Sequence, residues 1–177
     1  MPPHFLLKTM NNQHRLLATL TALSLMFLIG ACSSSTTQTA SPTPQPKTIT
    51  AADLTKLRWI EGSWRGTGDI DKPFYERYKF ESDTTLMVES FPDEKFEKAT
   101  EVDRFVLKDG HFGKFGGESG SVASALDDNS ITFEPTGKAR NSFRFQRESA
   151  DTWKAILNWK EADGTSKERV YKMERMP

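Results

Sequence analysis

A change of periodicity takes place within one nine-residue stretch, IEGSWRGTG at residues 60–68. Before it, apolar residues recur at a spacing of three over residues 54–60, which predicts one apolar stripe on a short helix. Gly62 ends that helix, and from Trp64 onward the pattern changes to the period of two that is typical of strands. The stretch therefore predicts a helix that leads into the first strand of a β domain.

Ten strand-like segments follow, separated by turn signals at intervals of roughly eight to twelve residues. Asp-Gly pairs, which favour tight hairpins, mark two of the turns at residues 109–110 and 163–164. Sequential antiparallel strands without covering helices usually remove their edges by closing. We predict an all-β fold, a closed or nearly closed antiparallel barrel of about eight to ten strands with the short helix at its base. The expected strands are 64–70, 74–81, 85–91, 100–108, 111–115, 120–126, 130–135, 142–148, 152–160 and 166–175.

The composition argues against several classes of function. The 24 Lys and Arg residues balance the 24 Asp and Glu residues, so no net charge attracts nucleic acid. The single cysteine allows no intrachain disulfide. The sequence has no histidine pair spaced for zinc, no Cys-x-x-Cys and no Gly-x-Ser-x-Gly elbow. We predict a protein that is not an enzyme and takes no metal, cofactor or nucleic acid.

The beginning of the chain has the layout of a secretory signal. Basic residues precede an apolar run at residues 16–29. At 1.5 Å per residue this run covers about 21 Å, short of the roughly 30 Å core of a bilayer. It leads into LIGAC at residues 28–32, where small residues stand directly before a cysteine. This segment resembles the bacterial lipoprotein signal with its lipobox.

The resemblance implies that Cys32 becomes the lipidated N-terminal residue. Ser33 after it, rather than an aspartate, implies sorting to the outer membrane in a cell with two membranes. We therefore expect a signal peptide at 1–31, a lipidated and disordered Ser/Thr/Pro tether at 32–49, and a folded domain at 50–177. The expected location is the bacterial cell envelope, at the periplasmic face of the outer membrane. The alternative is an uncleaved signal anchor with an incidental cysteine.

The junction of helix and strand carries a second resemblance. Gly62-x-Trp64 after a short helix resembles the opening motif of the lipocalin and fatty-acid-binding barrels, the calycins. The fuller form at residues 62–68 is similar to the start of nitrobindin-like barrels. WIEGSW at 59–64 with YERY at 75–78 resembles a group of uncharacterised bacterial calycin-like domains. The likeness extends loosely over residues 53–176 and implies a calycin-like barrel.

In calycins the motif tryptophan closes the base of the barrel, and an arginine of the last strand packs across it. Trp64 matches the first role, and Arg175 or Arg169 matches the second. The resemblance thus implies structural roles for Gly62, Trp64 and Arg175. Nitrobindin-like barrels hold haem through a late histidine, but no histidine follows His111 in this sequence, so haem binding is not implied.

Strand alternation predicts which side chains face the interior of the barrel. Two of them, Glu76 and Glu89, are carboxylates on largely apolar faces, where a charge is costly unless it is paired. Each is expected either to pair with an arginine of a neighbouring strand, such as Arg104 or Arg144, or to orient a polar group of a ligand. The candidate ligand-binding residues are Glu76, Tyr78, Phe80, Met87, Glu89, Trp153 and Trp159.

These patterns together predict a membrane-anchored envelope lipoprotein whose barrel binds or carries a small, largely apolar ligand. The interior of a small barrel is a usual place for such a ligand. One alternative is a structural or protein-interaction module of the envelope with a filled barrel. A weaker alternative is an enzyme with a site at the barrel mouth.

The lipid anchor can be tested at the cysteine itself. Cys32→Ser removes the thiol that would carry the lipid, so we expect the variant to lose labelled palmitate and to leave the membrane fraction. Ser33→Ala keeps the thiol and serves as the control. Unchanged labelling and fractionation of Cys32→Ser would contradict the assignment.

Overall fold

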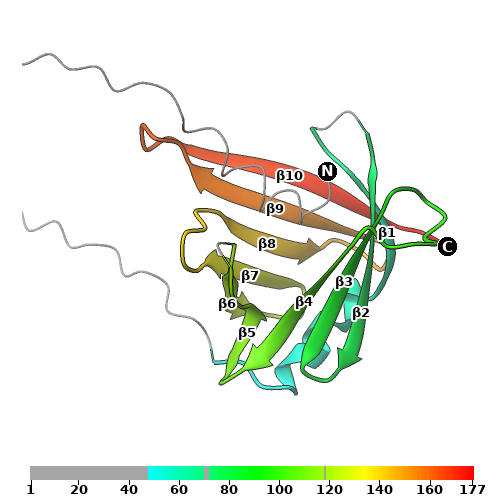
Figure 1. Ribbon diagram of the computed structural model, residues 1–177, viewed down its shortest axis with the longest axis horizontal. Helices are drawn as coiled ribbons and strands as arrows, with labels where there is room; N and C mark the ends of the chain where they lie inside the picture. Colours follow the sequence, from blue (N-terminus) through cyan, green and yellow to red (C-terminus); the bar gives the residue numbers. More distant parts are fainter. Residues whose placement is uncertain (1–47, 70–71, 118) are drawn as a thin grey trace, which may run out of the picture.

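A computed structural model describes residues 48–69, 72–117 and 119–177. The predicted signal peptide, Cys32 and nearly all of the predicted tether lie outside these residues. The described part of the chain forms one 3₁₀ helix, η2, and ten strands (Figure 1). The elements are η2 (Asp53–Ile60), β1 (Gly62–Thr67), β2 (Phe74–Ser82), β3 (Thr85–Phe91), β4 (Glu101–Lys108), β5 (His111–Lys114), β6 (Ser121–Leu126), β7 (Ser130–Pro135), β8 (Ser142–Arg147), β9 (Thr152–Lys160) and β10 (Ser166–Arg175).

The ten strands form a closed barrel in which each strand pairs with the next in sequence, and β1 also pairs with β10. All ten pairings are antiparallel. The predicted closed all-β barrel is confirmed, with every expected strand in place. This unit has its own core and no open sheet edge, which are the features of an independently folding domain. The described residues include no helix with the length and apolar character that crossing a membrane requires.

The predicted helix is present as a 3₁₀ helix rather than an α-helix. A 3₁₀ helix has three residues per turn, so its buried Leu54, Leu57 and Ile60 fall on one face. Thr50 and Asp53 cap its start reciprocally. The Asp53 amide donates to the Thr50 hydroxyl at 3.2 Å, and the Thr50 amide donates to the Asp53 carboxylate at 3.0 Å.

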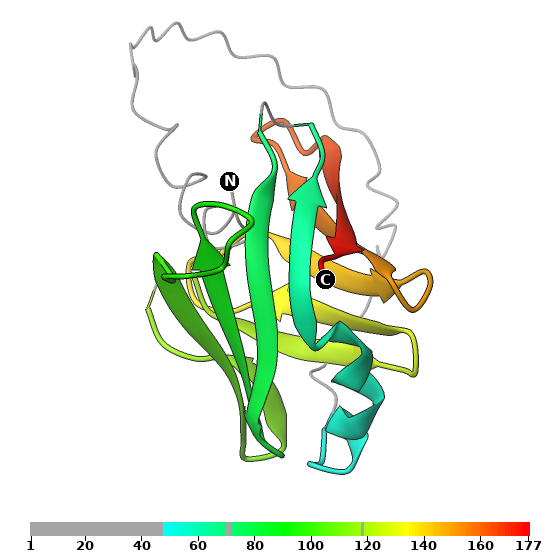
Figure 2. The same cartoon turned by 90° about the vertical axis from the view of Figure 1, so that its right-hand side faces the viewer.

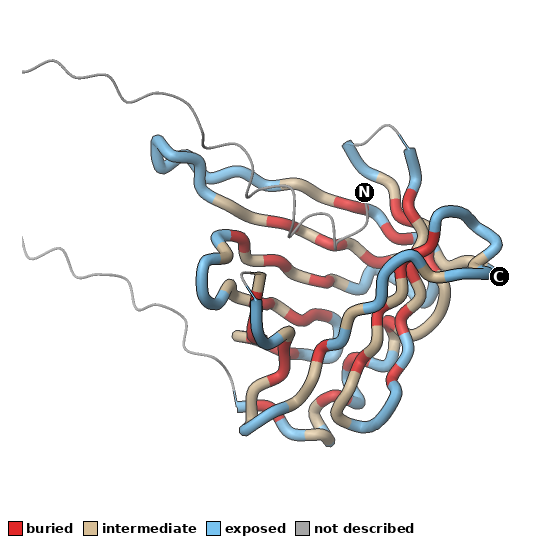
Figure 3. The backbone as a smooth tube through the Cα atoms, in the orientation of Figure 1, coloured by how far each residue is buried: buried red, intermediate tan, exposed pale blue. Residues whose placement is uncertain are grey.

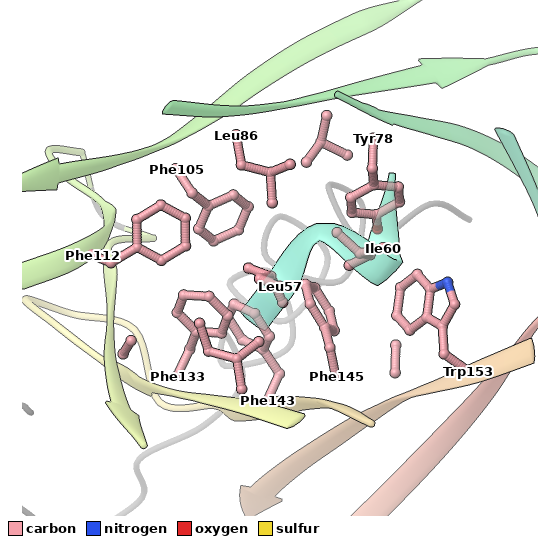
Figure 4. Close-up of a cluster of buried hydrophobic side chains, with 14 of the residues drawn as sticks. Leu57, Ile60, Tyr78, Leu86, Phe105, Phe112, Phe133, Phe143, Phe145 and Trp153 are labelled. Atoms are coloured by element: carbon pink, nitrogen blue, oxygen red, sulfur yellow. The ribbon is translucent and has the colours of Figure 1, made fainter. Parts of the chain in front are cut away.

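Figure 2 shows η2 at one end of the barrel, below β1, together with the 82–85 and 108–111 connections. We call this end the floor. Leu57 and Ile60 point from the helix into a ring of strand side chains, most of them aromatic (Figure 4). The opposite end, where β1 ends, β2 begins and the 160–166 connection lies, is the mouth. The short helix thus closes the floor of the barrel, as the sequence predicted.

Arg175 is the arginine that packs across Trp64. Its guanidinium carbon lies 4.1 Å from the centre of the Trp64 ring, and Nη1 donates to the Glu61 carbonyl at 2.8 Å. Trp64 is 1 % exposed, and its indole N–H donates to the Ile60 carbonyl at 2.7 Å. Gly62 has φ +126°, and a Cβ there would lie 2.3 Å from Arg175 Nη1. The glycine therefore makes room for the arginine that joins the last strand to the end of the helix.

Buried residues alternate with more exposed ones along the strands (Figure 3), as expected where successive side chains point to opposite faces of a sheet. On β2 the buried positions are Phe74, Glu76, Tyr78 and Phe80, as predicted. On β3 the prediction had the wrong phase, because Leu86, Val88 and Ser90 are buried there. The pairing of Tyr78 with Val88 fixes this phase, and a shift of one residue exchanges the two faces of a strand.

Met87 and Glu89 consequently lie on the outer face of the barrel. The aromatic Phe91 at the end of the strand made that face look interior. Its ring is buried against the outer surface instead, 5.0 Å from Phe96 and 4.8 Å from the guanidinium of Arg77. The prediction that Met87 and Glu89 line the interior was therefore wrong.

Loss of the Trp64 ring tests the closure of the floor. We expect Trp64→Ala to lower the free energy of unfolding by about 3–5 kcal/mol, the usual cost of removing a buried aromatic. Urea denaturation of residues 33–177 measures it. Trp159→Ala, at a half-buried position near the mouth, is the control and should cost clearly less. A denaturation midpoint for Trp64→Ala equal to that of the unmodified domain would contradict the role of Trp64.

Candidate ligand site inside the barrel

Glu76 lies on the inner face of β2, with Tyr78 next to it on the floor side and Phe74 on the mouth side. In the strand register it stands between Trp64 of β1 and Ser90 of β3. These two side chains are almost completely buried, and Glu76 is 0 % exposed. A carboxyl group enclosed in this way needs hydrogen bonds or a counter-charge to remain ionised.

One carboxyl oxygen of Glu76 has a partner, and the other has none among the described residues. The Tyr78 hydroxyl donates to Glu76 Oε2 at 2.7 Å. Within residues 48–69, 72–117 and 119–177, neither Glu76 Oε1 nor the hydroxyl of Ser90 on the next strand has a hydrogen-bond partner. Ser121 of β6 carries a further buried inner-face hydroxyl that has no partner in the described part of the chain. Buried polar atoms in folded proteins are usually paired, so this interior has unfilled hydrogen-bonding capacity.

Burial raises the pKa of Glu76 from its ordinary value of 4.5 to about 8. The hydrogen bond from Tyr78 acts in the opposite direction but is the smaller effect. Burial, together with the neighbouring Glu76, also raises the pKa of the Tyr78 hydroxyl well above 10. At neutral pH both groups therefore carry their protons, and Glu76 is a neutral carboxylic acid.

Below this level, on the floor side, the interior is packed with rings. Trp153 is 0 % exposed and lies 5.9 Å from Trp64, 5.5 Å from Tyr78 and 5.0 Å from Phe145, centre to centre. Phe133 stacks on Phe143 at 4.6 Å. This layer of packed aromatic side chains continues round the barrel to those of β4 and β5, which Figure 4 also shows. The half of the barrel near the floor is thus filled by its own side chains.

Towards the mouth the interior becomes polar and charged. Lys114 of β5 forms an ion pair with Asp103 of β4. On β10, Arg169 lies 5.8 Å from the centre of the Trp159 ring and donates to the Tyr171 hydroxyl at 3.5 Å. The register places Arg169 opposite the buried Leu157 and Asp103 opposite the buried Val88, so both belong to inner faces.

The structure brings together only part of the predicted ligand set. Glu76 and Tyr78 are in direct contact, and Trp153 packs beneath them. Trp159 lies near the mouth, where its indole N–H donates to Glu161 at 2.9 Å. Phe80 is at the floor, with the guanidinium of Arg58 4.2 Å from its ring.

Pairing with an arginine of a neighbouring strand is confirmed for Glu89, although not with either arginine named, and is wrong for Glu76. Arg104 pairs with Glu81 on the outer surface at 2.7 Å, and Arg144 donates to the Ser130 hydroxyl at 3.1 Å. Glu89 does pair with an arginine, Arg77, at 3.7 Å, and this pair also lies on the outer surface. Glu76 instead takes the Tyr78 hydroxyl as its partner.

Sequence reasoning missed Ser90 and Ser121, whose hydroxyls lie inside the barrel. A signal for Ser90 was present, since the set Leu86, Val88 and Ser90 is as apolar as the competing set on the other face. The described residues bring together no group of three or more His, Cys, Asp or Glu side chains that could hold a metal ion.

The fold and the interior define a closed ten-stranded barrel whose floor is sealed by a tryptophan and an arginine. This arrangement agrees with the calycin-like barrel that the Gly-x-Trp opening implies. No family model and no curated protein matches the chain.

The chain is similar to several solved structures. One is the crystal structure of a point mutant of the fluorescent protein UnaG, with a TM-score of 0.44 and 11% identity, covering 68% of this chain and 99% of that one. Another is EF1p2_mFAP2b bound to DFHBI, with a TM-score of 0.36, 11% identity, and 68% and 97% covered. A redesigned β barrel has a TM-score of 0.31, 14% identity, and 74% and 99% covered.

The raised pKa of Glu76 makes the stability of the barrel depend on pH. Between pH 4.5 and about 8 the unfolded chain releases a proton that the folded chain keeps, so stability falls as the pH rises through this window. The loss is on the order of 4–5 kcal/mol, because each pKa unit corresponds to about 1.4 kcal/mol. Denaturation of the unmodified domain and of Glu76→Gln at pH 4.5 and pH 8.5 measures it. Glu76→Gln should remove this part of the pH dependence.

Glu89→Gln changes an outward-facing glutamate on the adjacent strand and is the matched control. It should leave the pH dependence of the unmodified domain in place. The same pH dependence in Glu76→Gln as in the unmodified domain would show that Glu76 titrates normally.

Proposed function

We propose that this protein binds a small, largely apolar molecule in the mouth-side half of the barrel. The observation that carries the proposal is that three buried oxygens on the inner faces of three separate strands have no hydrogen-bond partner among the described residues, namely Glu76 Oε1, Ser90 Oγ and Ser121 Oγ. A barrel selected only for stability would be expected to pair such groups or to replace them by apolar ones. Aromatic side chains beneath them offer the apolar contact that small-molecule sites use.

The packed floor limits the ligand to the other half of the interior. The core cluster joins the floor rings with the helix residues Leu54, Leu57 and Ile60, so this end is occupied by the chain itself. The mouth side has the ion pair of Lys114 with Asp103 and the cation of Arg169 near its rim. A ligand held there would place an apolar part towards the floor and a polar part towards these groups.

We further propose that the barrel is held at the bacterial outer membrane by lipid on Cys32. The support is the sequence layout of signal, lipobox and proline-rich tether. At its other end the tether meets the floor, where the Ile49 amide donates to the Gly110 carbonyl at 2.7 Å. An anchored barrel would then be attached at its closed end, with the mouth at the far end.

The second candidate function is a structural or protein-interaction module of the envelope. The observation that favours it is the solid aromatic packing of the floor-side half. The two candidate functions make different predictions about ligand binding, because a module with a filled interior has no room for a ligand.

Dye binding decides between the two. We expect the neutral apolar dye Nile red to bind residues 33–177 saturably, with a blue shift and increased emission. Ser90→Phe puts a bulky ring into the space that the ligand would occupy. It should weaken dye binding by about tenfold or more, which corresponds to a loss of at least about 1.4 kcal/mol of binding free energy. Glu89→Phe, one residue away on the outer face, is the matched control and should bind as the unmodified domain does.

A filled barrel gives the opposite results. Nile red would not bind, and Ser90→Phe would lower the melting temperature by overpacking the core. Native mass spectrometry of the protein purified from its own cells then shows whether a natural ligand accompanies it.

A further inference from the structure

The interior of the barrel contains one carboxyl group whose two oxygens are in different situations. Glu76 Oε2 accepts the hydrogen bond from Tyr78 at 2.7 Å, so the proton of the neutral acid belongs on Oε1. Oε1 is buried and has no partner among the described residues. A protonated Oε1 is a hydrogen-bond donor held inside an apolar environment, where an acceptor would be bound most strongly.

Ser90 extends this donor into a two-point site. It stands directly opposite Glu76 in the register of β2 and β3, its side chain is 1 % exposed, and its hydroxyl is also unpartnered within the described part of the chain. Residues opposite each other on one face of an antiparallel pair have Cβ atoms about 4.5–5.5 Å apart. One oxygen atom of a ligand can therefore meet both side chains.

On these grounds we infer that Glu76 and Ser90 bind an uncharged hydrogen-bond acceptor of the ligand, a ketone, ester or amide carbonyl. The Glu76 carboxylic acid donates to the carbonyl oxygen, Ser90 provides a second donor, and Tyr78 fixes the orientation of the acid. This assignment rests on the proposed function and adds to it the chemical class of the ligand. An apolar molecule without an acceptor would leave both groups unpaired, which costs affinity.

The groups around Glu76 favour its neutral form. The nearest side chains across the register, Trp64 and Ser90, carry no charge. The negative charges of Asp103 and Glu101 on β4 also disfavour ionisation of Glu76. Burial, the larger effect, and these charges together raise its pKa to about 8, so the acid is neutral at physiological pH. The charged and titratable groups on the inner faces of the surrounding strands are Tyr78 on β2, Glu101 and Asp103 on β4, Lys114 on β5 and paired with Asp103, and Arg169, Tyr171 and Arg175 on β10.

Ionisation of Glu76 would turn the donor into an acceptor and repel the carbonyl oxygen. Binding of a carbonyl ligand is therefore expected to weaken as the pH rises above about 8, although the ligand itself does not titrate. Glutamine at this position keeps an N–H donor of similar reach and stays neutral, so it separates hydrogen bonding from titration.

Two matched dyes test the inference on residues 33–177. Prodan is a neutral naphthalene with a propionyl ketone, and 2-dimethylaminonaphthalene is the same ring system without the ketone. At pH 6.5 we expect Prodan to bind about tenfold more tightly than the dye without the ketone, the effect of one well-placed hydrogen bond. At pH 9.5 the preference should disappear in the unmodified domain and persist in Glu76→Gln.

Glu76→Met removes the donor but keeps a side chain of similar length. It should lose the preference for Prodan at both pH values while it still binds the dye without the ketone, which also shows that the variant is folded. Glu89→Met is the control on the outer face and should behave as the unmodified domain.

The outcomes separate this inference from the proposed function. Equal affinity of the unmodified domain and Glu76→Met for Prodan, or a Prodan affinity unaffected by pH, would overturn the carbonyl site and leave ligand binding in place. Absence of binding by both of these dyes and by Nile red would overturn the proposed function, and the carbonyl site with it.

Discussion

Closure of the barrel depends on one residue of the last strand. Arg175 lies across the Trp64 ring, and its three guanidinium nitrogens donate to the carbonyls of Glu61, Trp59 and Ala150. These carbonyls belong to the residue before the first strand, the end of the helix and the connection before β9. A single planar cation thus joins the two ends of the domain. Neither the β1–β10 pairing nor the position of the helix would be as well fixed without it, because both converge on this contact.

The helix, its junction with β1 and the ten strands could be predicted from the sequence, because the residue patterns that define them are local. The spacing of three in Leu54, Leu57 and Ile60 matches the 3₁₀ turn, and the Gly62-x-Trp64 motif marks the junction where the helix gives way to β1. The turn residues between strands define all ten segments. The choice between Arg175 and Arg169 was open, because both lie on the same face of β10 and only the register with β1 shows that Arg175 stands beside Trp64.

The errors arose where the answer depends on partners distant in sequence. The strand at residues 85–91 has apolar residues on both faces, and only its pairing with β2 determines that Val88 rather than Glu89 points inward. Phe91 suggested the wrong face because its ring is buried outside the barrel, against Phe96 and Arg77. The partner of Glu76 is an exception, because Tyr78 lies two residues away on the same face of β2 and its hydroxyl, rather than an arginine of another strand, donates to the carboxyl group.

The division of the interior into two halves links the fold to the proposed function. The floor needs dense aromatic packing because the helix is too short to be stable by itself and must bury Leu57 and Ile60. That packing in turn excludes water from the level just above it, where Glu76 stands, and so keeps the carboxyl group neutral. An apolar side chain at this position would remove the desolvation cost of the acid. The presence of Glu76, whose burial lowers stability as the pH rises, is explained if its Oε1 binds a ligand. A hydrogen-bond donor inside an apolar interior is suited to binding the polar atom of such a molecule.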